Sequence, residues 1–489
     1  MLPLLLTDSC FLLPGTALAQ TEKAPTPVAL PDTPAGKRIG EWLAALNSGE
    51  RTRMRQFLAA NSATPATGTA PIDAMTNRQM GFYPGSGGYE IGKIVATPSP
   101  SRITVALKAK RTGYWLLVGL SVTPEAPYTI LGFGFRNTEA PAELLPPKKL
   151  TEREIRTRAD VLINKLIAAD QFSGVILVAK DGKPVYQRAV GLASRAWNLP
   201  NRMDTRFNLG SINKMFTAVA IAQLVEQGKL SYSDTLEKAL PDYPNREIAQ
   251  KVTVRHLLSH TSGITETKSL LSGDAFRQEF RNVNDYLRNT AADTLKFEPG
   301  TRLEYSSYTY LILGAIIEKA SGQSYFDYVR EHIYKPAGMT ASDSYDLDTD
   351  PPNLATGYMD AEKGTRLSNI QRLPIRGMPF GLGYATAGDL VRFSTALREH
   401  KLLNAASLET VWTGVMDYTE FGSKYGYGFI VKTYNGQRIV GHGGGWVGIT
   451  NKFDMYPDSG YTVVILNNID SDPNSVAFKF REWLTQGGL

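Results

Sequence analysis

The chain has 489 residues and a formal net charge of +6, with 42% hydrophobic and 20% charged residues. These fractions are typical of a globular protein and exclude a fibrous or an intrinsically disordered chain. The modest positive charge forms no dense stripe of Lys and Arg, so composition argues against nucleic acid as a partner. The length predicts two or three domains and is ample for a large buried core.

The first segment, residues 1–19, is predicted to be a signal peptide. Leucine-rich runs are followed by Ala17-Leu18-Ala19, a small-x-small cleavage pattern before Gln20. The one cysteine, Cys10, lies in this segment, so cleavage would leave no thiol, disulfide or cysteine metal site. No later run reaches the ~20 apolar residues of a transmembrane helix. We therefore expect an exported protein, periplasmic or secreted, without a transmembrane segment.

A small α+β domain is predicted over residues 37–138, between a proline-rich linker at 20–36 and a second one at 139–150. Helical spacing of apolar residues runs over 39–46 and resumes over 54–58. Three strand-like segments with turns between them follow, at Ile103–Ala109, Tyr114–Val122 and Tyr128–Phe135. This arrangement resembles the NTF2-like cone, and we expect binding, docking or a structural role from it.

Residues 151–489 are predicted to form a second, larger domain. A capping box at Thr151 and Glu154 begins an amphipathic helix, and a hairpin follows over 175–190. Four more strands at 427–466 and a last helix from Ser475 lie at the other end of the domain. Both ends therefore build one antiparallel sheet flanked by helices. The middle, from Ser211 to about Leu408, is mostly helical, and a pocket is expected between sheet and helices.

Ser211 and Lys214 lie at the start of an apolar helix that ends at Gly228. Residues at i and i+3 of a helix are neighbours on one face. A serine hydroxyl needs a base within hydrogen-bond reach, and Lys214 is the candidate. Taken alone, the pattern is also compatible with a serine helix cap and a surface lysine.

Two further stretches carry candidate residues. Tyr305 precedes an apolar helix; its phenol could shuttle a proton, or its ring could pack in the core, the usual place of a tyrosine. His442 stands in the run Gly441-His442-Gly443-Gly444-Gly445-Trp446, on or beside a strand. Glycines in a strand indicate close approach of another backbone or a ligand.

The remaining histidines predict no metal centre. His256 and His260 share one loop, but a third ligand at suitable spacing is missing there. We interpret these two as hydrogen-bonding residues that fix the loop. His332 and His400 are isolated in the sequence.

Together these stretches resemble the penicillin-recognising serine hydrolases: class C β-lactamases, DD-peptidases, D-amino-acid peptidases and esterases of the β-lactamase fold. The resemblance rests on the ordered motifs at 207–214, 257–263, 305–307 and 442–444, and it covers roughly residues 155–489. It implies an α+β fold in which an antiparallel sheet flanked by helices carries a helical subdomain.

The resemblance also implies roles for individual residues. Ser211 would be the acylated nucleophile and Lys214 its base or proton relay. Tyr305 would be the general acid and base, and His442 would replace the Lys of a Lys-Thr-Gly motif. The backbone N–H groups of Ser211 and Gly445 would form the oxyanion hole. Lys214 must be neutral to accept a proton, so its pKa has to be lowered.

Two departures from the family pattern concern the substrate. The Asn of the usual Tyr-x-Asn motif is Ser307, and the hydroxyl residue after the Lys or His is Gly443. The second change removes a donor that would hold the carboxylate of a β-lactam or of a C-terminal D-alanine. Gly444 would line the substrate site together with Ser307 and Gly443. Trp446 suits an apolar acyl or aryl group, although packing on the sheet is an equal alternative.

The resulting prediction is a serine hydrolase that acts, without metal or cofactor, on an ester or a D-amino-acid peptide or amide. Its partner would be a small-molecule substrate, with cell-wall material among the sources. The alternatives are a β-lactamase or penicillin-binding DD-carboxypeptidase, and a catalytically silent protein of the same fold that senses cell-wall material.

Overall fold

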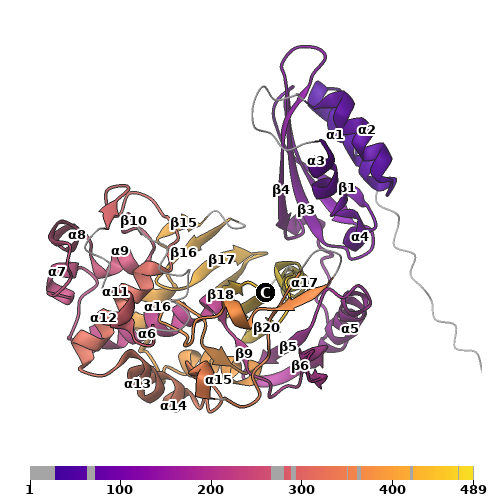
Figure 1. The fold of residues 1–489 in the computed structure, drawn as a ribbon. Helices are drawn as coiled ribbons and strands as arrows, with labels where there is room; N and C mark the ends of the chain where they lie inside the picture. Colours follow the sequence, from indigo (N-terminus) through magenta and orange to yellow (C-terminus); the bar gives the residue numbers. More distant parts are fainter. Residues whose placement is uncertain are drawn as a thin grey trace, which may run out of the picture.

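The computed structural model describes residues 28–62, 72–265, 280–287, 293–349, 351–360, 365–418, 422–471 and 473–487. The predicted signal peptide lies outside these residues, as does the first part of the linker at 20–36. Figure 1 shows a smaller body, built from residues up to about 138, that stands on one end of a larger one. Each body has its own buried hydrophobic cluster.

The smaller body packs helices on one antiparallel sheet with strand order β1-β2-β3-β4. Its elements are α1 (Pro34–Asn47), α2 (Arg51–Asn61), α3 (Ile72–Met80), α4 (Tyr83–Ser86), β1 (Tyr89–Ser99), β2 (Arg102–Ala109), β3 (Trp115–Val122) and β4 (Ile130–Thr138). The two helices and three strands expected from the sequence are present. Helix α1 begins inside the predicted linker, because Thr33 caps it by accepting a hydrogen bond from the Gly36 N–H at 3.1 Å. Strand β1 and helices α3 and α4 were not predicted.

The larger body is built on an eight-stranded antiparallel sheet with the order β15-β16-β17-β18-β19-β20-β5-β6. Its strands are β5 (Gly174–Lys180), β6 (Lys183–Val190), β15 (Met416–Tyr418), β16 (Ser423–Tyr425), β17 (Ile430–Tyr434), β18 (Gln437–Trp446), β19 (Ile449–Met455) and β20 (Tyr461–Asn467). The two ends of this part of the chain meet at β5 and β20, where Val175 pairs with Leu466. The single sheet that the sequence predicts from both ends is therefore observed.

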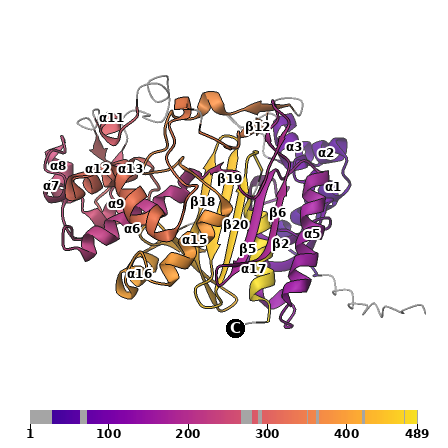
Figure 2. The same cartoon turned by 90° about the horizontal axis from the view of Figure 1, so that it is seen from below.

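Helices cover both faces of this sheet (Figure 2). One face carries α5 (Glu152–Ala168) and α17 (Pro473–Thr485), which pack on apolar residues such as Ile176 and Ile465. The predicted capping box at Thr151 and Glu154 begins α5. The other face carries the helical part: α6 (Asn213–Glu226), α7 (Leu236–Ala239), α8 (Arg246–Lys251), α9 (Val254–Leu258), α11 (Val283–Leu287), α12 (Tyr308–Ser321), α13 (Tyr325–Val329), α14 (Lys335–Ala337), α15 (Ala387–Arg398) and α16 (Ala405–Trp412).

Short two-stranded pairings connect the loops between these helices. They are β7 (Leu192–Ser194) with β8 (Leu199–Pro200), β9 (Phe207–Asn208) with β14 (Tyr384–Ala385), β10 (Ile264–Thr265) with β11 (Thr294–Leu295), and β12 (Tyr358–Asp360) with β13 (Arg366–Ser368). The pairing of β9 with β14 matters for the site, because β9 leads directly into the turn that carries Ser211.

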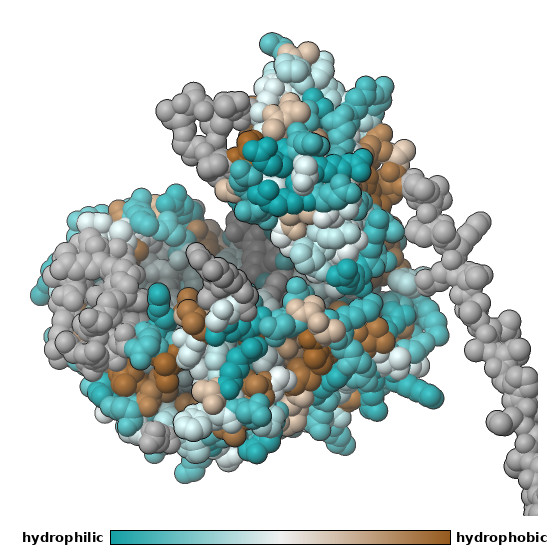
Figure 3. Space-filling model, turned by 45° about the vertical axis from the view of Figure 1, so that its right-hand side comes forward, coloured by the Kyte–Doolittle hydropathy of each residue, from teal (hydrophilic) through white to brown (hydrophobic). Residues whose placement is uncertain are grey.

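The segment between the two bodies is fixed to the larger body by buried ion pairs. Glu139 accepts a hydrogen bond from the Arg481 guanidinium at 2.6 Å and also pairs with Lys432. Arg481, on α17, in turn holds both carboxylate oxygens of Asp454 at 2.8 and 3.0 Å. All four side chains are less than 10% exposed. Figure 3 shows a mostly hydrophilic face with a recess between the two bodies.

Candidate active site

Ser211 lies in a single 3-10 turn, Gly210–Ile212, that runs directly into helix α6. Gly210 has φ of +53°, a left-handed conformation that glycine adopts without a steric penalty. A β-carbon on Gly210 would also lie 2.6 Å from the backbone nitrogen of Gly445. Glycine at this position therefore brings the Ser211 turn and strand β18 into contact.

Lys214 extends from the first turn of α6 towards Ser211, and its Nζ lies 3.1 Å from the Ser211 Oγ. The same nitrogen lies 2.7 Å from the carbonyl oxygen of Phe380 and 3.3 Å from the Oγ of Ser307. A neutral amine has two N–H donors and one lone pair. Donation to Phe380 and Ser307 therefore leaves the lone pair for the Ser211 hydroxyl.

Burial supplies the neutral amine that this arrangement needs. The Lys214 side chain is fully buried, and the loss of hydration lowers its pKa from 10.5 to about 7. The nitrogen lies 5.0 Å from the ring centre of Tyr305 and 5.5 Å from that of Tyr310, so aromatic faces replace water around it. Near neutral pH a large fraction of Lys214 is uncharged.

The glycine run on β18 permits a close backbone contact, as its composition predicts. A β-carbon on Gly444 would lie 1.9 Å from the carbonyl oxygen of Leu209, which comes two residues before Ser211. Gly443 is different, because the nearest atoms to a β-carbon there are 3.7 Å away. Gly444 is thus required by packing, whereas Gly443 leaves open space.

His442 is buried in the wall of the site as a neutral imidazole. Its Nδ1 lies 2.5 Å from the carbonyl oxygen of Gly443, an atom that can only accept, so Nδ1 carries the proton. Its Nε2 accepts from the Tyr425 hydroxyl at 3.0 Å. Burial, followed by the charges of Lys214 and Lys452, lowers the pKa of His442 to about 3. His442 therefore stays uncharged over the ordinary pH range.

Tyr305 lies over the site beside His442, with ring centres 6.2 Å apart. The imidazole of His260 also packs against Tyr305, at 4.2 Å between ring centres. His260 also accepts a hydrogen bond from the Ser306 N–H at 3.2 Å. The role expected for His260, fixing a loop by hydrogen bonding, agrees with this contact, and the loop that it fixes is the one that carries Tyr305.

Most of the predicted residues line one cavity of about 310 Å³. Its walls are Ser211, Tyr305, Tyr418, Ile430, His442, Gly443, Gly444, Gly445, Thr450, Asn451, Lys452 and Asn474. Lys214 and Ser307 lie behind Ser211 and reach it through the contacts given above. Trp446 lies apart from these walls, and its indole N–H donates to the Arg372 carbonyl oxygen at 2.8 Å. A role for Trp446 in binding substrate stays a prediction.

Sequence reasoning missed several residues that shape this site. The Phe380 carbonyl oxygen accepts from Lys214, and the Lys452 side chain lines the cavity; both come from segments that carry no recognisable pattern. Asn451 holds the β9 end by donating to the Asn208 carbonyl oxygen at 2.7 Å. The alternation of Lys452 and Asp454 with Phe453 and Met455 was the one available signal, and it is equally compatible with a solvent-exposed strand face.

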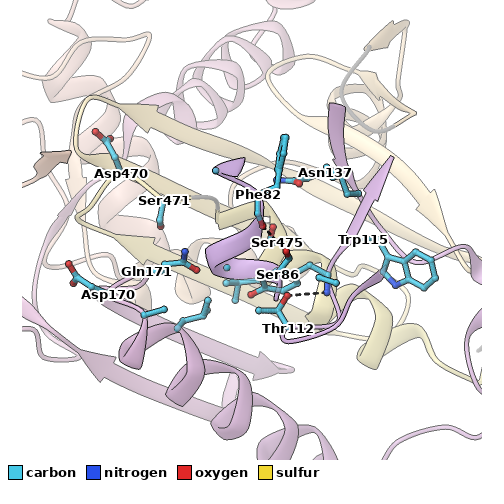
Figure 4. Close-up of a pocket in the computed structure, with 18 of the residues that line it drawn as sticks. Phe82, Ser86, Thr112, Trp115, Asn137, Asp170, Gln171, Asp470, Ser471 and Ser475 are labelled. Carbon is cyan, nitrogen blue, oxygen red and sulfur yellow. Dashed lines mark hydrogen bonds between the residues drawn. The ribbon is translucent and has the colours of Figure 1, made fainter. Parts of the chain in front are cut away.

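A larger cavity of about 660 Å³ lies between the two bodies (Figure 4), and Ser211 is not among the residues that line it. Phe82, which precedes α4, Ser86 of α4 and Trp115 of β3 form one side, and Gln171 and Ser475 lie on the side of the larger body. Of the residues predicted for catalysis, Ser211, Tyr305 and His442 line the smaller cavity, and Lys214 contacts Ser211 from behind its wall.

Over the described ranges, no group of three or more His, Cys, Asp or Glu side chains is placed to hold a metal ion. In the same part of the chain, none of the helices combines the length and the apolar character that crossing a membrane requires.

Comparison with known proteins relates the larger body to one family. The family model described as Beta-lactamase matches residues 159–485. Penicillin-binding protein 4* of Bacillus subtilis is 30% identical over 332 residues, which are 65% of this chain and 72% of that protein. The crystal structure of a penicillin binding protein from Bacillus halodurans has a TM-score of 0.59 and 31% identity, covering 68% of this chain and 99% of that one. A D-stereospecific amidohydrolase from Streptomyces sp. has a TM-score of 0.54 and 25% identity over 62% of this chain and 92% of its own.

Proposed function

Because the chain belongs to the Beta-lactamase family and has its α+β fold, we propose that it is a serine hydrolase that works through an acyl-enzyme on Ser211. One observation carries the proposal. A fully buried lysine with a pKa of about 7 lies 3.1 Å from a serine hydroxyl on the wall of a cavity. A serine hydroxyl next to an uncharged amine is an activated nucleophile.

In the acylation step, the Lys214 lone pair takes the hydroxyl proton as the Ser211 Oγ bonds to the substrate carbonyl carbon. The negative charge that develops on the carbonyl oxygen is stabilised by the backbone N–H groups of Ser211 and Gly445, where one such donor is typically worth ~3–4 kcal/mol of barrier. The bond to the leaving group then breaks. The leaving group receives its proton from Tyr305, which is replenished by the proton on Lys214.

Deacylation reverses these roles with water in place of the leaving group. Tyr305 takes a proton from a water molecule as the water oxygen attacks the acyl carbonyl carbon, and it passes its own proton to Lys214. The ester bond to Ser211 breaks, and the Ser211 oxygen regains a proton from Lys214. His442 stays neutral throughout. Its Nε2 accepts from the Tyr425 hydroxyl, which fixes the imidazole beside Tyr305.

The proposed substrate is an ester or a D-amino-acid amide or peptide. The likeness to penicillin-binding proteins and to a D-stereospecific amidohydrolase supports an acyl donor of this kind. The signal-like segment at residues 1–19 supports action outside the cytoplasm, where peptides of the cell wall are among the candidate substrates.

The test combines covalent labelling with turnover. We expect a fluorophosphonate to add once to the protein, as read by intact mass, and p-nitrophenyl esters to be hydrolysed. Ser211→Ala should abolish both while far-UV circular dichroism and Tm stay unchanged. Ser407→Ala, on helix α16 away from the cavity, is the matched control and should keep both. Tyr305→Phe should still be labelled but turn over about 10²–10⁴-fold more slowly.

Two results would contradict the proposal. Equal labelling of Ser211→Ala and wild type would place the nucleophile elsewhere. Absence of both adduct and hydrolysis across esters, D-amino-acid amides and β-lactams would favour the silent binding protein of the same fold.

A further inference from the structure

The outer edge of strand β18 opens towards the cavity of Ser211. In the described part of the chain, β17 pairs with β18 only as far as Ile430 with Gly441. From His442 onwards β18 pairs with β19 on its other side, where Gly443 stands opposite Lys452. The segment from His442 to Gly445 therefore borders the cavity with its free edge, and Figure 2 shows β18 and β19 adjacent in the sheet.

Lys452 reaches this edge from the face of the sheet that α17 covers. Opposite residues in an antiparallel pair point to the same face, so Lys452 shares a face with the missing side chain of Gly443. A β-carbon on Gly443 would lie 3.7 Å from the Lys452 Nζ. The ammonium thus lies beside the space where a Ser or Thr hydroxyl at position 443 would reach. Lys452 is only 5% exposed, yet it lines the cavity.

The surrounding charges favour an anion at this place. Five buried side chains form a cluster between β17, β19 and α17: Glu139, Lys432, Lys452, Asp454 and Arg481. Lys432 and Arg481 hold Glu139, and Arg481 holds both oxygens of Asp454. The cluster contains three cations and two carboxylates, so it carries a net positive charge. Lys452 is the member that lies at the wall of the cavity containing Ser211.

The position of Tyr305 indicates which part of a substrate would meet this charge. Tyr305, the acid proposed for the leaving group, lies beside His442, whereas the oxyanion donor is Gly445. The leaving group therefore extends along the His442 and Gly443 end of the strand, next to Lys452.

We propose that the Lys452 ammonium binds a carboxylate on the leaving group of the substrate and so determines specificity for acidic leaving groups. This inference rests on the serine hydrolase activity proposed above. By itself, Gly443 indicates the loss of a donor to a substrate carboxylate, and this inference reverses that interpretation. The donor that the hydroxyl would supply comes instead from the neighbouring strand, and the absence of a side chain at 443 provides the room for it.

The test uses two matched esters of phenylacetic acid, the 3-carboxyphenyl and the 3-carbamoylphenyl ester. They have the same shape and differ in one charge on the leaving group. For the wild type we expect kcat/KM to favour the carboxylate ester by about tenfold or more, the effect of one charge-assisted hydrogen bond. Lys452→Met and Lys452→Gln should both bring the ratio of the two kcat/KM values close to one, and Lys452→Arg should keep the preference.

Lys424→Met is the control, because Lys424 is an exposed lysine on β16 of the same sheet. It should keep the wild-type ratio. Hydrolysis of both esters without preference by the wild type, or an unchanged ratio in both neutral variants, would overturn this inference alone. Failure of the wild type to hydrolyse either ester, together with the absence of a fluorophosphonate adduct on Ser211, would overturn the proposed function and this inference with it.

Discussion

The α-carbon of Gly444 packs so closely on Leu209 that a β-carbon there would lie 1.9 Å from the Leu209 carbonyl oxygen. A real β-carbon cannot approach a backbone oxygen to this distance, so one of the two segments has to move. The movement separates strand β18 from the turn of Ser211. It would also pull the Gly445 N–H away from the place where we propose that it stabilises the oxyanion.

We therefore expect Gly444→Ala to lower Tm and to reduce kcat/KM for a p-nitrophenyl ester by about 10²-fold or more, the loss of an oxyanion donor. Gly443→Ala is the paired variant, because its β-carbon meets its nearest neighbour at 3.7 Å. It should have the Tm of the wild type. Equal Tm values for the two variants would show that the Gly444 contact is not a packing constraint.

The pH dependence of acylation should follow Lys214. Burial lowers the pKa of Lys214 to about 7, and only the uncharged amine can accept the Ser211 proton. We expect kcat/KM to rise with pH through about 7 and then to level off. His442 adds no step between pH 5 and 9, because burial and neighbouring charges lower its pKa to about 3. A profile that falls as pH rises through 7 would contradict Lys214 as the base.

Lys214 should also make stability depend on pH. Its pKa is about 7 in the folded protein and 10.5 by reference, so the unfolded chain binds more protons between these two values. Stability rises with pH wherever the unfolded state binds more protons. The contribution of Lys214 therefore improves from pH 7 to about 10, by at most about 1.4 kcal/mol per pH unit. Below pH 7 the group is charged in both states, and its contribution is constant.

Lys214→Met removes this titration. We expect the Tm of this variant minus the Tm of the wild type to fall as pH rises from 7 to 10, measured by thermal unfolding in buffers of equal ionic strength. The comparison is of slopes, so it is insensitive to the hydrogen bonds to Phe380 and Ser307 that the variant also loses. A difference that is constant with pH would show that Lys214 keeps an ordinary pKa.

The buried ion pairs at Glu139 should contribute far more to the free energy of unfolding than exposed ion pairs do. Glu139→Gln leaves Arg481 and Lys432 without their shared carboxylate in a buried place, and breaking a buried pair typically costs about 3–5 kcal/mol. Glu143 pairs with Lys93 at the exposed surface, so Glu143→Gln should cost about 1 kcal/mol or less. Urea unfolding of the two variants measures the contrast, and similar losses would contradict it.

The parts of the site that depend on local chain geometry were predictable. Ser211 and Lys214 are three residues apart, so helix geometry alone brings them together. The capping box at Thr151 and the hairpin over 175–190 are equally local. The meeting of Tyr305 and His442 was predicted from family motifs and not from physics, because nothing in either segment specifies the other.

What could not be predicted depends on register between distant segments. Lys452 on a strand reads as a solvent-exposed residue, and its place in the cavity follows only from its pairing with Gly443. Strand β1 was missed because irregularities in its register with β2 break the alternation that marks a strand. The contact of the Trp446 indole N–H with the Arg372 carbonyl oxygen joins two segments distant in the sequence, and a role for Trp446 in binding substrate stays a prediction.

The family match begins at residue 159, which invites the removal of everything before it to obtain a minimal hydrolase. The position of Glu139 argues against that cut. A shortened chain starting at 151 would keep Arg481 on α17 and Lys432 on β17 but delete the Glu139 carboxylate that pairs with both. The smallest fragment that we expect to fold as the larger body therefore includes the peptide that follows β4.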